Sequence, residues 1–292
     1  MNKKMIATDV FIRDVDRWLA ENDYAEETTK SYRRVLRLLV AAIDDLAGLD
    51  GLGLRTWLDG RGWGSSMRWV AFGAIRGFLR WRFGATHPAL ALKIKRLSSP
   101  PQRFLRLPQI RMLLASFDTS SAKGRRDLAI CGLALDTGLR VSELCRLSLR
   151  YLNLERRSLQ VIVKGGQWSY RAYSDHAATW IAAWLSDRAG LAALGADEVF
   201  VSVGGMTPGQ KLTRHGLQVE VRKWGRRAGI GQISPHDLRR SMATVSTTLG
   251  APEDIAMKAG GWKSHEVFRH YTVGVTADDM RPYFPTAAAM ND

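Results

Sequence analysis

An arginine and a glutamate three residues apart are the first candidates for chemistry in this sequence. They lie in Leu-Asp-Thr-Gly-Leu-Arg-Val-Ser-Glu-Leu, residues 135–144. Gly138 can end one helix, so that Arg140 begins the next, where unpaired backbone N–H groups favour an anion. The Glu143 carboxylate can then hold the Arg140 guanidinium, although ordinary surface ion pairs have the same spacing and contribute little to stability. The stretch predicts an anion-binding arginine with a supporting carboxylate.

A second candidate lies in Ser-Pro-His-Asp-Leu-Arg-Arg, residues 234–240. Ser234 as N-cap, with Pro235 at the first helical position, is a strong helix start. His236 and Arg239 then share a face near the positive end of that helix, and both can donate hydrogen bonds to a phosphate. A packed or capping histidine would give the same pattern. We favour the phosphate role for His236 and assign Asp237 only to stabilising the helix dipole.

Two further stretches are not diagnostic alone. Lys164 lies at the tip of a predicted β-hairpin, between the runs 158–163 and 168–174, where a lysine is usually solvated. The other stretch is Gly-Gly-Trp-Lys-Ser-His-Glu-Val-Phe-Arg-His-Tyr, residues 260–271, in which Tyr271 follows Trp262 by nine residues.

The combination of these residues is diagnostic. In order and spacing they resemble the tyrosine recombinase family, which includes phage integrases and Xer- and Cre-like enzymes; the positions are Arg140, Lys164, His236, Arg239, Trp262 and Tyr271. The first family box stands here as T-G-L-R-x-S-E-L and the second as H-x-L-R-R-S. Trp262 replaces the usual histidine of the third box, as in some members. The hairpin departs further, because V-K-G-G-Q-W stands where members often have G-K-G-x-K-x-R.

The chemistry of these residue types agrees with the resemblance. Attack on a phosphodiester concentrates negative charge on the phosphate oxygens, which two arginines, Arg140 and Arg239, can clamp. The resemblance implies that Tyr271 forms a 3′-phosphotyrosyl link with DNA. It also implies that Lys164 protonates the leaving 5′-oxygen and that His236 assists proton transfer at the tyrosine. The Trp262 indole N–H would donate to a phosphate oxygen, and Glu143 would support Arg140.

Such a link conserves the energy of the broken bond, so we expect neither a cofactor nor a metal. The sequence agrees, because it contains no G-x-x-x-x-G-K-[ST] loop, no H-E-x-x-H pair and no paired carboxylates suited to magnesium. Three other interpretations stay open at this point. They are a type IB topoisomerase-like nicking-closing enzyme, a catalytically decayed DNA-binding protein and, less favoured, a basic RNA-binding protein.

The charge of the chain indicates a polyanionic partner. The formal net charge is +15 and the pI is about 10.3. Residues 60–117 contain eleven lysines and arginines and no acid, whereas a solvated face normally mixes signs. Within that run we expect DNA contacts from Arg68, Arg76, Arg80, Lys93, Lys95 and Arg96.

A membrane partner is disfavoured, because the apolar run 36–43 is far shorter than the roughly 20 residues that cross a bilayer. The N-terminus has no apolar signal-peptide core. The two cysteines, Cys131 and Cys145, lie in apolar helix-like stretches and are expected to be buried thiols. We therefore expect a cytoplasmic, nucleoid-associated protein.

These residues must be positioned by a mostly α fold with a small β-sheet. The pattern predicts helices over about 27–44, 65–83, 107–116 and 124–137. We expect a helical core-binding, SAM-like domain over 1–86, a linker over 87–103 marked by His87-Pro88 and Ser98-Ser99-Pro100-Pro101, and a mixed α+β catalytic domain with a C-terminal tail over 104–292.

The resemblance also implies partners. These are double-stranded DNA with inverted-repeat core sites and a homotetramer on two duplexes, in which the tail, about 276–285, docks into a neighbouring subunit. The absence of an arm-binding domain before the core-binding region favours a simple recombinase on short sites. The target sequence, the accessory proteins and the biological role, whether integration or resolution, stay open.

Overall fold

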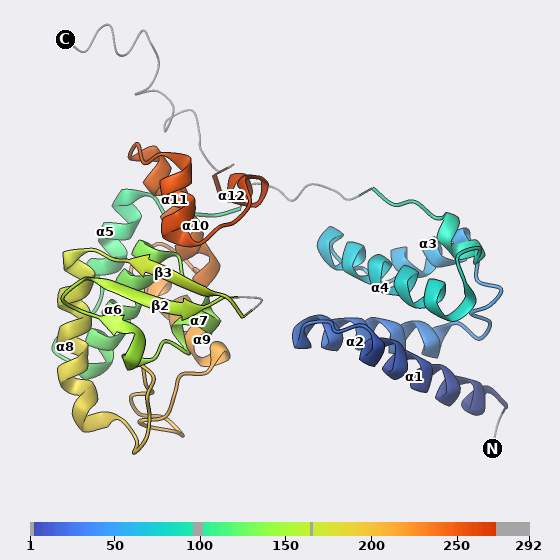
Figure 1. The fold of residues 1–292 in the computed structure, drawn as a ribbon, viewed down its shortest axis with the longest axis horizontal. Helices are drawn as coiled ribbons and strands as arrows, with labels where there is room; N and C mark the ends of the chain where they lie inside the picture. Colours follow the sequence, from blue (N-terminus) through green and yellow to red (C-terminus); the bar gives the residue numbers. More distant parts are fainter. Residues whose placement is uncertain (1–2, 96–101, 164–165, 273–292) are drawn as a thin grey trace, which may run out of the picture. The chain divides into compact units, whose positions relative to one another are not determined.

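The computed structural model describes residues 3–95, 102–163 and 166–272. The chain divides into two compact units, Met1–Pro100 and Pro101–Asp292. The described part of the first unit is helical, and the second unit combines helices with a small antiparallel sheet (Figure 1). The expected fold class, mostly α with a small β-sheet, is confirmed. None of the helices in these ranges has both the length and the hydropathy that a bilayer crossing requires.

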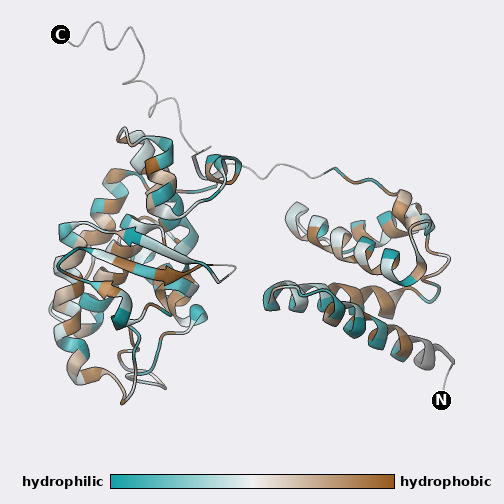
Figure 2. Cartoon of the chain, in the orientation of Figure 1, coloured by the Kyte–Doolittle hydropathy of each residue, from teal (hydrophilic) through white to brown (hydrophobic). Residues whose placement is uncertain are grey.

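The first unit contains four helices and a 3₁₀ turn in its described part, and its core lies between the helices. Their bounds are α1 (Lys3–Glu21), α2 (Glu26–Ala42), α3 (Gly51–Asp59), α4 (Ser65–Phe83) and η1 (Pro88–Ala91). On α2, the buried residues Val35, Leu36 and Leu39 face this core, while Arg34 and Arg37 lie on the exposed side. This helical spacing of apolar residues, seen as mixed colours along the helices in Figure 2, is why the segment folds as an amphipathic helix.

The first unit extends beyond the predicted boundary at residue 86. His87 is buried and its Nε2 lies 2.8 Å from the Leu46 carbonyl oxygen. Ala89 and Leu92 are buried in the same core as α3 and α4. At the other end of the predicted linker, Arg103 Nη1 donates to the Gln232 carbonyl of the second unit (2.7 Å). The linker prediction of 87–103 was therefore too long, because Pro88 starts a packed 3₁₀ turn.

The second unit is built around α6, whose buried residues run through its whole length. α8 and α10 pack on it, and the sheet lies against it (Figure 1). The bounds are α5 (Leu107–Ala115), α6 (Ala122–Thr137), α7 (Val141–Leu144), η2 (Leu149–Tyr151), α8 (Asp175–Leu191), α9 (Arg214–Arg227), α10 (Pro235–Thr248), α11 (Glu253–Gly260) and α12 (His265–Thr272). Cys131 and Cys145 are buried free thiols, as predicted.

The sheet has the strand order β1-β2-β3, with both pairs antiparallel. The strands are β1 (Leu152–Asn153), β2 (Ser158–Ile162) and β3 (Trp168–Ala172). The predicted hairpin is confirmed, with Ile162 opposite Trp168 and Leu159 opposite Arg171. The short strand β1 was not predicted.

A buried polar network fixes α9 on α6. Asp127 is 1% exposed, and its carboxylate accepts hydrogen bonds from Arg126 Nε (2.9 Å) and Trp224 Nε1 (3.0 Å). Lys123 Nζ adds a third contact at 3.0 Å. Because Arg126 is itself buried, its charge depends on this carboxylate for compensation.

Asp127→Asn should therefore destabilise the second unit by about 3–5 kcal/mol, since it leaves the buried Arg126 cation unpaired. The urea midpoint, followed by near-ultraviolet circular dichroism, measures the loss. Asp175→Asn is the matched control, because its ion pair with Arg157 is largely exposed (51% and 81%) and should be worth at most about 1 kcal/mol. Equal midpoints for the two variants would contradict the role assigned to Asp127.

Candidate active site

Arg140 and Glu143 form the predicted pair. Gly138, in the left-handed region (φ 58°), ends α6, and Arg140 is the N-cap of α7. Glu143 Oε2 accepts from the Arg140 backbone N–H (2.8 Å), and Oε1 accepts from its guanidinium (2.9 Å). The Glu143 side chain is 3% exposed whereas that of Arg140 is 43% exposed. The buried carboxylate thus holds an arginine whose remaining donors face outward.

The start of α10 is also as predicted. The Ser234 hydroxyl accepts from the Asp237 backbone N–H (3.3 Å), and the Asp237 carboxylate accepts from the Ser234 N–H (2.8 Å) and from Arg240 (3.0 Å). Asp237 therefore closes the helix start, and this orientation presents His236 and Arg239 one turn apart.

Arg239 joins three segments at the centre of the site. It is 1% exposed, and its Nη1 donates to the Gly138 carbonyl at the end of α6 and to the Gly260 carbonyl at the end of α11 (3.1 Å). Burial lowers the pKa of Arg239 to about 10, with Arg140 adding to the effect and Tyr271 opposing it. The guanidinium therefore stays protonated at neutral pH.

Two aromatic rings lie against this guanidinium, and a third, His236, packs on one of them. Its carbon lies 3.8 Å from the centre of the Trp262 ring and 5.7 Å from that of Tyr271. The Tyr271 ring is 5.0 Å from Trp262 and 5.3 Å from His236, both in edge-to-face arrangements. Thr244 of α10 donates to the Tyr271 backbone carbonyl (2.7 Å), which fixes the end of α12 on α10. Arg239, Trp262, Tyr271 and His236 are thus brought together from α10, the α11–α12 loop and α12.

His236 is held neutral in this environment. Burial, together with the charges of Arg240, Arg239 and Arg140, lowers its pKa to about 4, while Asp237 opposes this shift. A neutral imidazole can accept a proton, which a positively charged one cannot.

Several buried donors of the site have no hydrogen-bond partner. Within the described residues, six buried side-chain nitrogens lack one, and four of them belong here: Nε and Nη2 of Arg239, Nε1 of Trp262 and Nε of Arg171. Unpaired buried donors are costly and rare in folded proteins. The three donors of Arg239 and Trp262 lie around the Tyr271 ring and suit an anion with several acceptor oxygens, such as a phosphate.

Arg171 was not predicted as a site residue. It lies on the inner face of β3, is 2% exposed, and interacts electrostatically with both Glu143 and Arg140. The run Trp-Ser-Tyr-Arg-Ala would have indicated a buried arginine only if its aromatic residues had been assigned to the outer face of the sheet. They do lie on that face, where Trp168 is 52% and Tyr170 60% exposed.

The remaining predicted residues divide into three groups. Lys164, Arg96 and the tail over 276–285 lie outside the described residues. Arg68 bonds Asp59 (2.6 Å), and Arg76 donates to the Leu92 carbonyl (3.2 Å), so both contribute to the fold of the first unit. The third group contains the predicted DNA-contact residues that are exposed, Arg80, Lys93 and Lys95. The exposed Arg34 and Arg37 of α2 add further cations that fall outside the acid-free run.

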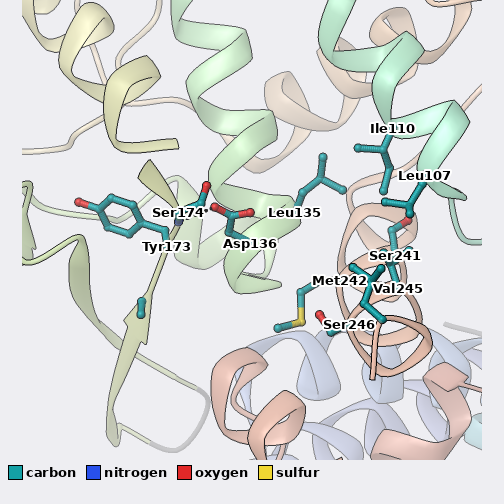
Figure 3. A pocket seen from close by; sticks show the side chains of 12 residues that line it. Leu107, Ile110, Leu135, Asp136, Tyr173, Ser174, Ser241, Met242, Val245 and Ser246 are labelled. Atoms are coloured by element: carbon teal, nitrogen blue, oxygen red, sulfur yellow. Dashed lines mark hydrogen bonds between the residues drawn. The ribbon is translucent and has the colours of Figure 1, made fainter. Parts of the chain in front are cut away.

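A cavity of about 420 Å³ lies beside the site. Figure 3 shows Leu107, Ile110 and Met242 around it, with Asp136 next to Ser174. The Asp136 carboxylate accepts from the Ser174 backbone N–H (2.8 Å). Apolar walls and a carboxylate do not suit a phosphate, and none of the residues assigned to the chemistry lines this cavity.

Comparison with known proteins agrees with this arrangement. Residues 103–275 match the phage integrase family. The tyrosine recombinase XerD of Pseudomonas aeruginosa is 30% identical over 248 residues, which cover 80% of this chain and 82% of that protein.

Solved structures share the fold. The Tn1549 transposon integrase in complex with circular intermediate DNA has a TM-score of 0.74 and 14% identity, covering 94% of this chain and 98% of that one. A lambda integrase dimer bound to a COC′ core site has a TM-score of 0.72 and 16% identity, covering 91% and 96%. At these identities the likeness concerns the fold alone. Because the family match spans more than half of the sequence and XerD is similar across both units, the chain belongs to the phage integrase family and is a tyrosine recombinase, an enzyme that cleaves and rejoins DNA.

Proposed function

We propose that this recombinase uses Tyr271 as the nucleophile and passes through a 3′-phosphotyrosyl intermediate. The observation that carries the proposal is the packing of the Tyr271 ring against Trp262 and close to the Arg239 guanidinium, where buried N–H groups lack acceptors. A phosphodiester supplies those acceptors, and the phenol oxygen is the nucleophile beside them.

In the proposed reaction the Tyr271 oxygen attacks phosphorus and the bond to the 5′-oxygen breaks. Arg140 and Arg239 stabilise the charge that develops on the non-bridging oxygens, and the Trp262 N–H donates to one of them. The phenol proton passes to His236. A phosphate among the surrounding arginines offsets the charges that hold the pKa of His236 low, which makes the imidazole a better base.

Lys164 is the proposed general acid for the 5′-oxygen. It lies outside the described residues, and its assignment depends on its position in the hairpin between β2 and β3. Rejoining is the reverse reaction, in which a 5′-hydroxyl attacks the phosphotyrosine and the proton returns to the phenol. The link conserves the energy of the phosphodiester, so the scheme needs no cofactor and no metal.

Double-stranded DNA with inverted-repeat core sites is the proposed substrate, bound at the nucleoid. The net charge of +15 and the exposed Arg80, Lys93 and Lys95 favour contacts with phosphates. We assign the first unit to core binding and the second to catalysis. The fold is similar to that of a lambda integrase dimer on a core site. We propose that this chain likewise occupies paired half-sites and exchanges strands as a homotetramer on two duplexes.

Trapping on a nicked substrate tests the nucleophile. The native target, identified from DNA flanking the gene, is given a nick that lets the cleaved end diffuse away, and products are separated on a denaturing gel. Wild type should form a covalent protein–DNA adduct, and Tyr271→Phe should abolish it because phenylalanine has no nucleophilic oxygen. Tyr173→Phe is the matched control, since the Tyr173 hydroxyl donates to the Asn153 carbonyl (2.9 Å), outside the proposed phosphate site.

The outcomes separate the competing functions. No wild-type adduct despite specific binding would favour a decayed DNA-binding protein. An adduct with relaxation of one duplex, but no exchange between two, would favour a topoisomerase-like enzyme.

The pH dependence of stability tests whether His236 is neutral in the free protein. Its pKa of about 4 lies below the usual value near ~6.5, so the unfolded chain binds more protons between these two values. The free energy of unfolding is therefore unaffected by the titration of His236 above about pH 6.5 and decreases as the pH falls from 6.5 toward 4. Between pH 7 and pH 5 the melting temperature of wild type should fall by roughly 4–7 °C more than that of His236→Gln. Parallel curves would show that His236 does not titrate in this way.

The tail can be tested by deletion of residues 276–292. Its apolar residues Met280, Tyr283 and Phe284 are the proposed anchors in a neighbouring subunit. We expect the truncated chain to bind a single site within a few-fold of wild-type affinity and to lose the tetrameric complex with two duplexes, as measured by native gel and light scattering. An intact tetramer would contradict this role.

A further inference from the structure

Arg171 is a buried cation with no ion-pair partner among the described residues. It occupies the inner face of β3, opposite Leu159 in the register of the sheet, and is 2% exposed. Its Nη1 donates to the Ser169 hydroxyl and to the Tyr170 carbonyl (2.8 Å), and its Nε has no acceptor. In the part of the chain that the structure describes, no carboxylate lies within ion-pair distance of it. Such a charge is costly in a protein interior unless an anion compensates it.

The backbone of α11 is shaped around this guanidinium. A Cβ atom on Gly261 would lie 1.7 Å from Arg171 Nη2, so the guanidinium in its present position lies directly against the Gly261 backbone. Gly261 has a φ of 67° and ends α11 immediately before Trp262. A Cβ on the preceding Gly260 would lie 1.7 Å from the Trp262 ring. The two glycines therefore let Arg171 and Trp262 pack against the same short stretch of backbone.

The electrostatics link Arg171 to both arginines of the proposed clamp. Burial lowers the pKa of Arg171, Glu143 raises it and Arg140 lowers it. Glu143 and Arg140 exert the same two effects on the pKa of Arg239. Glu143 therefore attracts all three guanidinium groups, and the positive charge of the three exceeds what one carboxylate can neutralise.

We propose that Arg171 is a third arginine of the active site, a positioning residue that adds positive charge behind the phosphate and holds the Gly261–Trp262 backbone without touching the DNA. This inference rests on the proposed function. Nη1 of Arg171 is already bonded to Ser169 and to the Tyr170 carbonyl, and Nη2 lies against the Gly261 backbone, so we assign it a charge effect and not a phosphate contact. In a poorly solvated interior its charge acts over several ångströms. Its attraction for the phosphate increases in the transition state, when the oxygens gain negative charge.

Variants at position 171 separate charge from packing. Arg171→Lys keeps the charge, Arg171→Gln keeps polar contacts without charge, and Arg171→Met keeps only bulk. The two neutral variants should slow adduct formation by about ten- to a hundredfold, less than the hundred- to thousandfold typical of donors that touch the reacting oxygens. Arg171→Lys should retain most of the rate. Arg156→Met is the matched control, because it removes an exposed charge from the turn between β1 and β2.

Binding to modified DNA gives a readout that a purely structural role would not change. In a Tyr271→Phe background, which cannot cleave, single methylphosphonates replace in turn each phosphate across the centre of the target. Neutralising the phosphate held by the site should weaken binding several-fold. Adding Arg171→Gln should reduce that penalty at the same phosphate and at no other, whereas Arg156→Met should leave it unchanged.

The outcomes are distinct. Neutral and charged variants that cleave at equal rates, or a methylphosphonate penalty that Arg171→Gln leaves unchanged, would overturn the proposal. If wild type forms no adduct, the proposed function fails, and the methylphosphonate series still decides whether Arg171 acts on a bound phosphate. If one neutral variant does not fold, as judged by its melting temperature, the other provides the comparison with Arg171→Lys.

Discussion

One buried carboxylate organises the positive charge of the proposed active site. Glu143 bonds Arg140 directly, and its charge also acts on Arg239 and Arg171. A single negative charge cannot neutralise three guanidinium groups, so the site is preorganised for an anion before DNA arrives. Burial, together with this excess of positive charge, accounts for the features around it. His236 stays neutral, the Trp262 ring covers a cation, and donors that would normally be paired have no acceptor.

Local sequence signals predicted the parts of the fold that depend on local physics. The cap at Ser234, the glycine at 138 and the hairpin over β2 and β3 are each determined within a few residues, and each is present. The domain boundary was wrong because proline constrains only its own neighbourhood. Whether Leu92 packs into a core depends on α3 and α4, which lie elsewhere in the sequence.

The same distinction applies to the site. Order and spacing were enough to propose five site residues, and the structure places them near one another: Arg140, His236, Arg239, Trp262 and Tyr271. Arg171 could not be proposed in this way, because hydropathy suggests the opposite orientation for its strand. In a two-faced sheet the aromatic residues would be expected inside, yet Trp168 and Tyr170 face outward while the arginine is buried. Only the tertiary neighbours, Glu143 and Gly261, explain that inversion.

Substitution of Gly138 is expected to be especially damaging to the enzyme. Its left-handed backbone places Arg140 at the start of α7, its carbonyl binds Arg239, and a Cβ there would meet the Trp262 ring at 3.4 Å. A single nucleotide change that introduces a side chain would strain this left-handed backbone and so disturb two proposed site residues, Arg140 and Arg239, together. Compensation by a second change is correspondingly improbable, since no one substitution elsewhere restores both. Evolutionary drift in this enzyme is therefore expected to be slowest at a residue that performs no chemistry itself.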